Sequence, residues 1–491
     1  MKVDVLVVGA GPAGLSAAIE LRRLGVGSVL VAEREAAAGG VPRHSWHTGY
    51  GLRDLRRVMT GPAYARALAD AALAAGAELR LGTTVTGVIA GGGAGLGGGP
   101  VSVSMTSVDG VETVRAAAVL LATGCRERPR AARLIPGDRP AGVMTTGELQ
   151  QRVYLSAERR PGRALVVGAE HVSFSAAMTL AHAGARVIAL VTEYDRQQSY
   201  AAFRLGAALR WRVPVWTSAR VERVAGRGRL DGVEVADVRT GEARFVPCDT
   251  VVFTGDWIPD HELARLAGLA MDPGTRGPVV DTRLETSAAG VFAAGNLVHA
   301  AETADVAALS GRHAARHVAT MLGTGSKSLA AGARGAGVPI LAEPPLRWIS
   351  PNTITSAATP PLGRFVLRSR DFRRPARLEV RQDGRLLARS RRVRLVPERP
   401  VHLGAGWLAR VDPAGGPVRV VTGSLPVWLG APLRRPRSRV SVRRGRWRAE
   451  PPATSHAGRR HRARAAGPGL PPSARLHGGR RRRSTVAASP P

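Results

Sequence analysis

The amino-acid sequence predicts an α/β protein with two similar strand–turn–helix units, a small C-terminal β domain and an arginine-rich tail. In the first unit, the apolar strand Val3–Val8 leads through a glycine-rich turn into a helical pattern over Leu15–Leu24. The same order of strand, turn and helix begins again at Arg163. Beyond both units, residues 345–430 hold several β-like stretches, with a hairpin expected at Asp383-Gly384. Strands that alternate with helices predict parallel sheets.

The turn after the first strand contains the residues that a dinucleotide pyrophosphate requires. Gly9 permits a tight turn, Gly11 allows the backbone to approach the phosphates, and Gly14 allows the helix to pack closely on the strand. The unpaired N–H groups and the positive end of the helix dipole then face the phosphates. The expected cofactor contacts in this turn are Gly9, Gly11, Pro12, Ala13 and Gly14.

A second apolar strand, Ser28–Ala32, ends at Glu33. An acidic residue at this place accepts hydrogen bonds from a ribose 2′-hydroxyl. The acid favours an unphosphorylated ribose, so the expected cofactor is FAD or NAD rather than NADP.

Residues 39–124 complete the first unit. The loop over 39–51 has an unusual composition, with two histidines, an arginine and a tyrosine. Pro62 then begins a helix that runs to about Ala75. A flexible hairpin loop is expected at Gly91–Gly99, and the last strand ends at Thr123-Gly124. The expected strands are Val85–Ile89, Val101–Met105, Val111–Arg115 and Val119–Ala122.

The second unit repeats this pattern. A turn over 168–173 separates an expected strand from an expected helix, and Thr250–Gly255 echoes the strand end at Leu120–Gly124. A final strand and turn over 286–296 precede the last helix. The expected elements are the strands Arg163–Val167 and Val187–Val191, the latter ending at Thr192-Glu193, and the helices Phe174–Ala183 and Asp305–Met321.

Composition excludes several classes of protein. The two cysteines, Cys125 and Cys248, are far apart and form no CxxC pair. This excludes a disulfide framework, a dithiol redox pair and an iron–sulfur cluster held by the cysteines of this chain alone. Asp4 interrupts the N-terminal apolar run, and no segment approaches the ~18 to 20 apolar residues that span a bilayer. We therefore expect a soluble, cytoplasmic protein without membrane attachment.

The formal net charge of +34 is concentrated near the C-terminus. Residues 431–491 contain 17 arginines and one acid, Glu450, without apolar periodicity. Such a composition is typical of a disordered, solvated segment, or of an altered reading frame in a GC-rich coding sequence. A polyanion-binding arm is the alternative, but neither aromatic interleaving nor an RNA-binding fold signature supports recognition of nucleic acid.

The two nucleotide-binding units, closed by Val291-Phe292-Ala293-Ala294-Gly295, resemble the two-dinucleotide-binding-domain flavoproteins of the pyridine nucleotide–disulfide oxidoreductase class over about residues 1–325. This resemblance implies a discontinuous, Rossmann-like FAD-binding domain, 1–145 and 278–330. A degenerate NAD(P)-binding-like domain, 146–277, is then inserted into it. More narrowly, four stretches resemble the alpha-type subunits of amine and imino-acid dehydrogenases: hydrogen cyanide synthase, opine oxidase, and proline or hydroxyproline dehydrogenase. These stretches are 39–44, 122–130, 168–173 and 293–297.

The resemblance assigns further FAD contacts to loops that are far apart in the sequence. Gly295-Asn296 is expected near the pyrophosphate and the ribityl chain. Most relatives have aspartate where Asn296 stands, and asparagine still accepts a hydrogen bond while adding a donor. The region from His299 into the final helix points at the isoalloxazine edge in this fold. The contacts implied in this way are Gly40, Thr123, Gly124, Gly295, Asn296, Glu302 and Thr303.

The second turn departs from the fingerprint. Of its three glycines only Gly168 remains, and Glu170 and Ser173 occupy the other two positions. A carboxylate at the middle position places negative charge where a pyrophosphate would sit, and its side chain blocks close approach of the backbone. We favour a retained fold that no longer binds NAD(P), although Glu193 leaves ribose binding open.

The loop over 42–50 lies in the register in which disulfide reductases carry their redox cysteines. Counted from Gly39-Gly40, Pro42 stands at the first cysteine position and His47 at the second, which is beside the flavin. Dithiol chemistry is therefore absent. The candidate catalytic residues, able to hold a carboxylate or to stabilise an anionic reduced flavin, are Arg43, His44, His47 and Tyr50. Residues expected to serve domain packing or to be inert are Asp256, Trp257, His261 and Cys125.

The sequence thus predicts an FAD-dependent oxidoreductase, and more narrowly a subunit of an amine or imino-acid dehydrogenase of the proline, opine or glycine type. Its flavin would take a hydride from a C–H next to nitrogen. Expected partners are a small amine or amino-acid substrate and, as in some relatives, a small 2Fe–2S protein and a second flavoprotein subunit. The alternatives are a stand-alone NAD(P)H-dependent flavoprotein reductase and, in another class, a nucleic-acid-binding protein that acts through its tail.

Overall fold

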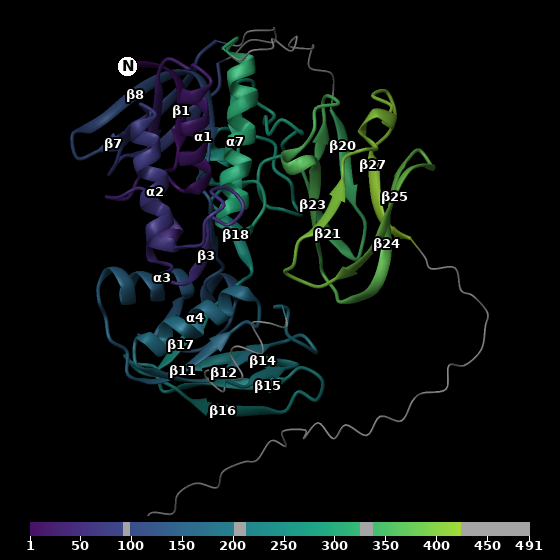
Figure 1. Cartoon of the computed structure of the whole chain (residues 1–491). Coiled ribbons are helices and arrows are strands. Elements are labelled where there is room, and N and C mark those ends of the chain that lie inside the picture. Colours follow the sequence, from purple (N-terminus) through teal and green to yellow (C-terminus); the bar gives the residue numbers. More distant parts are fainter. Residues whose placement is uncertain (92–98, 201–212, 325–336, 424–491) are drawn as a thin grey trace, which may run out of the picture. The chain divides into compact units, whose positions relative to one another are not determined.

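The computed structural model describes residues 1–91, 99–200, 213–324 and 337–423 (Figure 1). The arginine-rich tail and most of the expected hairpin loop at Gly91–Gly99 lie outside these ranges. None of the described helices is long and apolar enough to cross a membrane.

The first sheet joins two segments that are far apart in the sequence. Its strands follow the order β5-β2-β1-β8-β7-β6, and β19 pairs with β8. The pairs among β5, β2, β1, β8 and β19 are parallel, whereas β6 and β7 extend the sheet in antiparallel fashion. The second unit is therefore an insertion between β8 and β19, as expected. The bounds are β1 Lys2–Val8, β2 Val29–Ala32, β5 Glu78–Arg80, β6 Thr84–Ile89, β7 Val101–Ser107, β8 Gly110–Leu121 and β19 Val291–Ala293.

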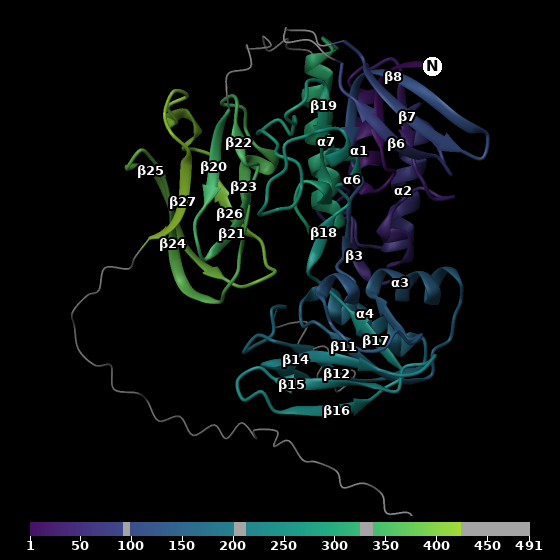
Figure 2. The ribbon, with the colours of Figure 1, turned by 180° about the vertical axis from the view of Figure 1, so that it is seen from behind.

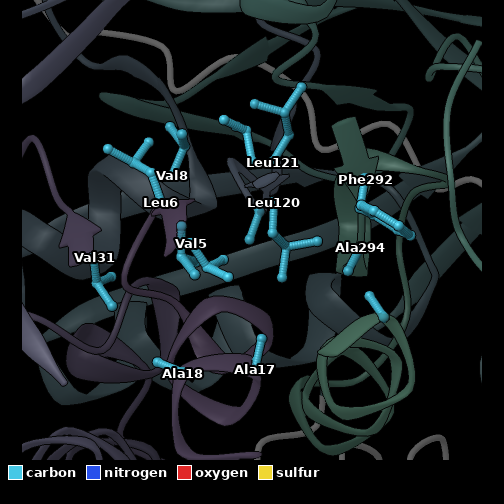
Figure 3. Packing of buried hydrophobic residues seen from close by; sticks show 14 of the residues in the cluster. Val5, Leu6, Val8, Ala17, Ala18, Val31, Leu120, Leu121, Phe292 and Ala294 are labelled. Carbon is cyan, nitrogen blue, oxygen red and sulfur yellow. The ribbon is translucent and has the colours of Figure 1, made fainter. Parts of the chain in front are cut away.

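The core of this part lies between the sheet and the helices α1 (Pro12–Arg23), α2 (Gly61–Ala74) and α7 (Ala304–Met321). Figure 3 shows side chains of β1 and β8 packed together with those of β19. Because the central strands are buried on both faces, their sequences are continuous apolar runs rather than alternating ones. The small side chains of Ala17 and Ala18 are fully buried where α1 covers the sheet.

Helix α7 packs directly on the first turn of α1. Gly311, in the middle of α7, faces the backbone of Ala13, and a Cβ atom at Gly311 would overlap the Ala13 carbonyl oxygen. Helix α7 can therefore lie this close to the glycine turn because Gly311 has no side chain.

The second sheet is parallel and follows the order β10-β17-β11-β12-β13. One face packs on α4 (His171–His182), and the other packs on an antiparallel sheet of β14, β15 and β16. Figures 1 and 2 show this layered arrangement from both sides. The strand bounds are β10 Val143–Thr145, β11 Gly162–Val167, β12 Ala185–Thr192, β13 Val215–Thr217, β14 Ala219–Ala225, β15 Gly232–Asp237, β16 Ala243–Pro247 and β17 Thr250–Phe253.

The chain passes between the two α/β parts twice, and the two passages pair with each other. β9 (Cys125–Glu127) and β18 (Trp257–Pro259) form an antiparallel ribbon. Thr123-Gly124 precedes the first passage, as expected, and Asp256 and Trp257 belong to the second.

The C-terminal part contains two sheets, ordered β22-β20-β27-β24-β25 and β21-β23-β26, around a separate apolar core. Asp383 and Gly384, with φ of 48° and 77°, form the two-residue turn of a hairpin, which confirms that prediction. The part begins at β20, earlier than the expected residue 345. The bounds are β20 Val338–Ala342, β21 Leu346–Ser350, β22 Thr353–Ile354, β23 Arg364–Ser369, β24 Arg373–Gln382, β25 Arg385–Leu395, β26 Val401–Gly404 and β27 Val418–Gly423.

The structure confirms the expected fold class and corrects details. The two strands expected at Val111–Arg115 and Val119–Ala122 form one strand, β8, because the residues between them pair with β1. The helix expected from Phe174 begins at His171, since Glu170 caps it. The remaining short elements are η1 Val41–His44, β3 Thr48–Tyr50, β4 Met59–Thr60, η2 Arg130–Arg133, α3 Thr146–Gln150, η3 Gln151–Leu155, α6 Glu262–Leu266, η4 Gly295–Leu297, η5 Pro361–Gly363 and η6 Leu408–Arg410.

Gly311→Val should destabilise the first α/β part by about 3 kcal/mol, because the new side chain forces α7 away from the backbone of α1. Thermal unfolding measures the effect. The matched control is Gly147→Ala in α3, where the nearest atom to an added Cβ is 3.6 Å away. An unchanged midpoint in Gly311→Val would contradict the close packing of α1 and α7.

Candidate functional site

The N-terminus of α1 is arranged to receive an anion. Gly11 is its N-cap residue, and no side chain of the described residues caps it. Gly9, with φ of 102°, and Gly14 are fixed by packing: a Cβ at Gly9 would lie 2.6 Å from the Ala122 carbonyl oxygen, and a Cβ at Gly14 would overlap the Gly9 carbonyl oxygen. Gly11 differs, because nothing lies within 4 Å of its added Cβ. Its missing side chain therefore leaves space beside unpaired helix N–H groups.

Glu33 lies beside this turn. Its carboxylate is buried, and it accepts hydrogen bonds from the Ala10 N–H at 2.7 Å and the Glu35 N–H at 3.0 Å. These bonds fix the carboxylate at the end of β2. Carboxylate oxygens have further acceptor capacity, so Glu33 can also accept from a ribose hydroxyl.

Two glycines from distant loops lie against the turn at the N-terminus of α1. Gly40, with φ of 60°, lies on the first turn, and its added Cβ would be 3.0 Å from the Gly11 Cα. Gly295, with φ of 69°, approaches α1 so closely that its added Cβ would be 2.7 Å from the Ala13 Cβ. The structure thus brings Gly40 and Gly295 to the first turn, where the sequence places the cofactor.

Thr123 and Gly124 hold the passage between the α/β parts. The Thr123 hydroxyl donates to the Asp260 carbonyl at 2.7 Å, and the Asp260 N–H donates to the Gly124 carbonyl at 2.9 Å. The side chain of Thr123 is therefore engaged with the second passage.

The segment from Asn296 to Thr303, here called the strap, leads into α7, and the Asn296 side chain bonds its two ends together. Its side-chain oxygen accepts from the Glu302 N–H at 2.8 Å, and its side-chain nitrogen donates to the Glu302 carbonyl at 3.2 Å. An aspartate could make only the first of these bonds, because it has no N–H donor. Thr303, the N-cap residue of α7, receives a hydrogen bond from Arg53 at 3.0 Å.

The carboxylate of Glu302 is held by the C-terminal part of the chain. Arg368, in β23, donates to Glu302 Oε1 at 3.0 Å and to the Ala301 carbonyl at 2.7 Å. The two side chains are 5% and 7% exposed, so this is a buried ion pair. His299 and Arg368 both lie against Trp348, and burial followed by Arg368 lowers the pKa of His299 to about 3.

The second nucleotide turn has the opposite arrangement. The Glu170 carboxylate accepts from the Val172 N–H at 2.5 Å and the Ser173 N–H at 3.1 Å, so it caps α4 with the chain's own negative charge. The Ser173 hydroxyl lies 2.6 Å from that of Thr254 and also donates to Glu170. Burial raises the pKa of Glu170. The N–H groups that a pyrophosphate would need at this helix are therefore already used.

The loop over 42–50 separates into buried and accessible groups. Arg43 forms an ion pair with Glu35, and His44 is buried, with a pKa lowered to about 4 chiefly by burial. His47 is partly exposed; its Nδ1 lies 2.9 Å from the Thr48 carbonyl oxygen, and its ring stacks on Tyr50 at 5.2 Å. Burial raises the pKa of Tyr50. Of the four expected catalytic residues, His47 is thus the partly exposed imidazole, whereas the Nδ1 atom of His44 is buried and has no hydrogen-bond partner among the described residues.

Three features escaped the sequence reasoning. Arg368 has no signal in its own strand, because its partner lies in another part of the chain. Asp54 accepts from the Tyr64 hydroxyl at 2.6 Å beneath the loop. Burial raises the pKa of Glu127 to about 7, and its position three residues after Gly124 was the available signal. His261, expected to serve packing, bonds the Arg276 carbonyl through Nδ1 at 2.5 Å.

Comparisons with known proteins agree with this geometry. Residues 3–311 match the pyridine nucleotide-disulphide oxidoreductase family. The chain is 32% identical over 199 residues to the benzene 1,2-dioxygenase system ferredoxin–NAD(+) reductase subunit of Pseudomonas putida, covering 39% of this chain and 46% of that protein. It is 28% identical over 342 residues to an opine oxidase subunit of Agrobacterium tumefaciens, covering 64% of each chain. It is 32% identical over 192 residues to the hydrogen cyanide synthase subunit HcnB of Pseudomonas aeruginosa, covering 38% of each.

The solved structures show the fold. Thioredoxin reductase from T. acidophilum superposes with a TM-score of 0.53 at 23% identity, covering 64% of this chain and 96% of that one. The chain spans less than half the length of the dioxygenase-system reductases from Pseudomonas putida and Paraburkholderia xenovorans.

The first site fits FAD. The family resemblance implies this cofactor, and the space beside Gly11, the uncapped N-terminus of α1 and the anchored Glu33 carboxylate match its pyrophosphate and ribose. Gly40, Gly295 and the strap from Asn296 to Thr303 would hold the rest of it.

Gly11→Glu should abolish FAD binding, because the added carboxylate occupies the space beside the helix N–H groups and repels the pyrophosphate. The measurement is the ratio of bound flavin to purified protein. Gly406→Glu is the matched control, since an added Cβ there also meets nothing within 4 Å. A Gly11→Glu protein that retained stoichiometric FAD would show that the phosphates bind elsewhere.

Proposed function

The chain belongs to the pyridine nucleotide-disulphide oxidoreductase family, and we propose that it is an FAD-dependent subunit of an amine or imino-acid dehydrogenase rather than an NAD(P)H-dependent reductase. The contrast between the two nucleotide turns carries this proposal. Helix α1 offers its N–H groups to a phosphate, whereas Glu170 consumes those of α4. Electrons therefore reach the flavin from an organic substrate or a partner subunit.

The likeness to HcnB and to the opine oxidase subunit supports the substrate class and the partners. Both names denote subunits of larger enzymes, and the match to opine oxidase extends over more of this chain than the match to the dioxygenase reductases. We propose a small amine or amino acid as the substrate. The partners we propose are a small 2Fe–2S protein and a second flavoprotein subunit.

His47 is the residue that we assign to proton transfer. A carbonyl oxygen can only accept, so the contact with Thr48 places the proton of the neutral imidazole on Nδ1 and leaves Nε2 as a base. Before a C–H next to nitrogen can leave as hydride, the substrate ammonium must lose a proton, and Nε2 can take it. Bound FAD supplies the hydride acceptor. Stacking on Tyr50 fixes the imidazole ring.

Arg43 and His44 have supporting roles in this proposal. The Arg43 guanidinium is held by Glu35, and His44 is neutral and buried at physiological pH. Both fix the position of the loop that carries His47.

An NAD(P)H-dependent ferredoxin reductase is the second candidate, favoured by the likeness to the dioxygenase-system reductases. It requires phosphate contacts at α4 that Glu170 now makes. Binding of nucleic acid through residues 431–491 stays a prediction from the sequence, because the tail lies outside the described residues. A cytoplasmic location also stays a prediction.

Under anaerobic conditions, proline, glycine or an opine should bleach the bound flavin of the wild-type protein in complex with its partner subunits. His47→Ala should retain its FAD while flavin reduction slows by roughly 10²–10⁴-fold, because the substrate must lose its proton to water. Stopped-flow absorbance measures the rate. The control is His182→Ala, which removes the imidazole at the end of α4 that is bonded to Tyr154 of η3; its rate should be unchanged. Flavin that none of these amines reduces would contradict the substrate class.

A further inference from the structure

A cavity of about 330 Å³ lies apart from the flavin site, where three parts of the chain meet. Tyr194 contributes to it from just beyond β12, and Gly274 and Arg276 from the segment that precedes β19. The C-terminal part contributes Arg347 of β21 and Arg370 just after β23. None of the lining residues belongs to either nucleotide turn.

The lining is strongly cationic. Arg276, Arg347 and Arg370 face one carboxylate, Glu398, which gives the cavity a net charge of +2. Within the described ranges, no ion pair or side-chain hydrogen bond engages any of these three guanidinium groups. Two arginines close by in the sequence do have partners. Arg368 pairs with Glu302, and Arg399 donates hydrogen bonds to backbone carbonyls.

Arg276 is partly buried beside a second cation. Burial, and then the like charge of Arg347, lower the pKa of Arg276. Arg276 and Glu398 also have left-handed backbones, with φ of 64° and 63°, which cost energy in residues other than glycine. Left-handed backbone at two lining residues, together with guanidinium groups that have no ion-pair partner among the described residues, is typical of a binding site.

We propose that the cavity binds a small molecule with two negative charges, carried by carboxylate or phosphate groups. Two charges neutralise the lining, and the planar fork of arginine matches both groups. Burial raises the pKa of Tyr194 to about 12, so its hydroxyl remains a neutral donor. The volume is at the lower end of the range for ligand pockets, roughly 300–1,000 Å³, and is too small for a dinucleotide. The cavity also lies beyond the carboxyl end of β12, where doubly wound sheets bind their ligands.

The test is calorimetric titration of the FAD-loaded full chain with malonate and, separately, with inorganic phosphate at constant ionic strength. We expect one anion to bind per chain. The affinity should fall at least about tenfold in Arg347→Gln and in Arg370→Gln, each of which removes charge-assisted hydrogen bonds. Arg392→Gln, exposed on β25 outside the cavity, should bind as the wild type does. Binding of malonate alone identifies a dicarboxylate, and binding of phosphate alone a phosphate ester.

Two outcomes would overturn the proposal. One is that neither anion binds at up to about 10 mM. The other is that both Arg347→Gln and Arg370→Gln retain wild-type affinity, which would assign the binding to other arginines, such as those of the tail. Flavin content and the thermal midpoint, measured on the same samples, show that the variants are folded. Because the cavity shares no residue with the flavin site, failure here leaves the proposed function untouched.

Discussion

Whether the N-terminus of each nucleotide-type helix is open or capped by a side chain determines which nucleotide phosphates the protein can bind. A helix N-terminus has a fixed set of N–H donors and one positive dipole end, so a phosphate and a carboxylate of the chain compete for the same place. At α1 the N-cap is Gly11, and no described side chain takes the place. At α4 the Glu170 carboxylate takes it with two hydrogen bonds. A fold with two nucleotide-type units therefore keeps one open anion site.

The C-terminal part contributes directly to the surroundings of that open site. Arg368 reaches from β23 to Glu302, whose backbone is bonded by Asn296 just before α7. A buried ion pair is expensive to break, because either charge alone would remain desolvated. The position of the α7 N-terminus thus depends on the C-terminal part of the chain.

The sequence predicted the features that depend on local chemistry. The glycine spacing at 9, 11 and 14, the acid at Glu33 and the substitution by Glu170 are each visible within one short segment of the sequence. In the structure, the Glu33 carboxylate bonds the turn at Ala10, and Glu170 caps α4. Ion pairs between side chains could not be predicted in this way. Nothing near Arg43 indicated that Glu35 would hold it, and nothing near Arg368 indicated Glu302. The sequence divides β8 in two at the three alanines 116–118, because alanine has a low strand propensity. Pairing with β1 nevertheless continues through these residues.

The most direct measurement is an anaerobic titration of the FAD-loaded protein with NADH, followed by flavin absorbance. Because the Glu170 carboxylate already occupies the N-terminus of α4 and repels a pyrophosphate, the flavin should stay oxidised at micromolar NADH. An amine substrate should bleach it when the partner subunits are present. Rapid, stoichiometric reduction by micromolar NADH would show that the second site still works, and would contradict this account.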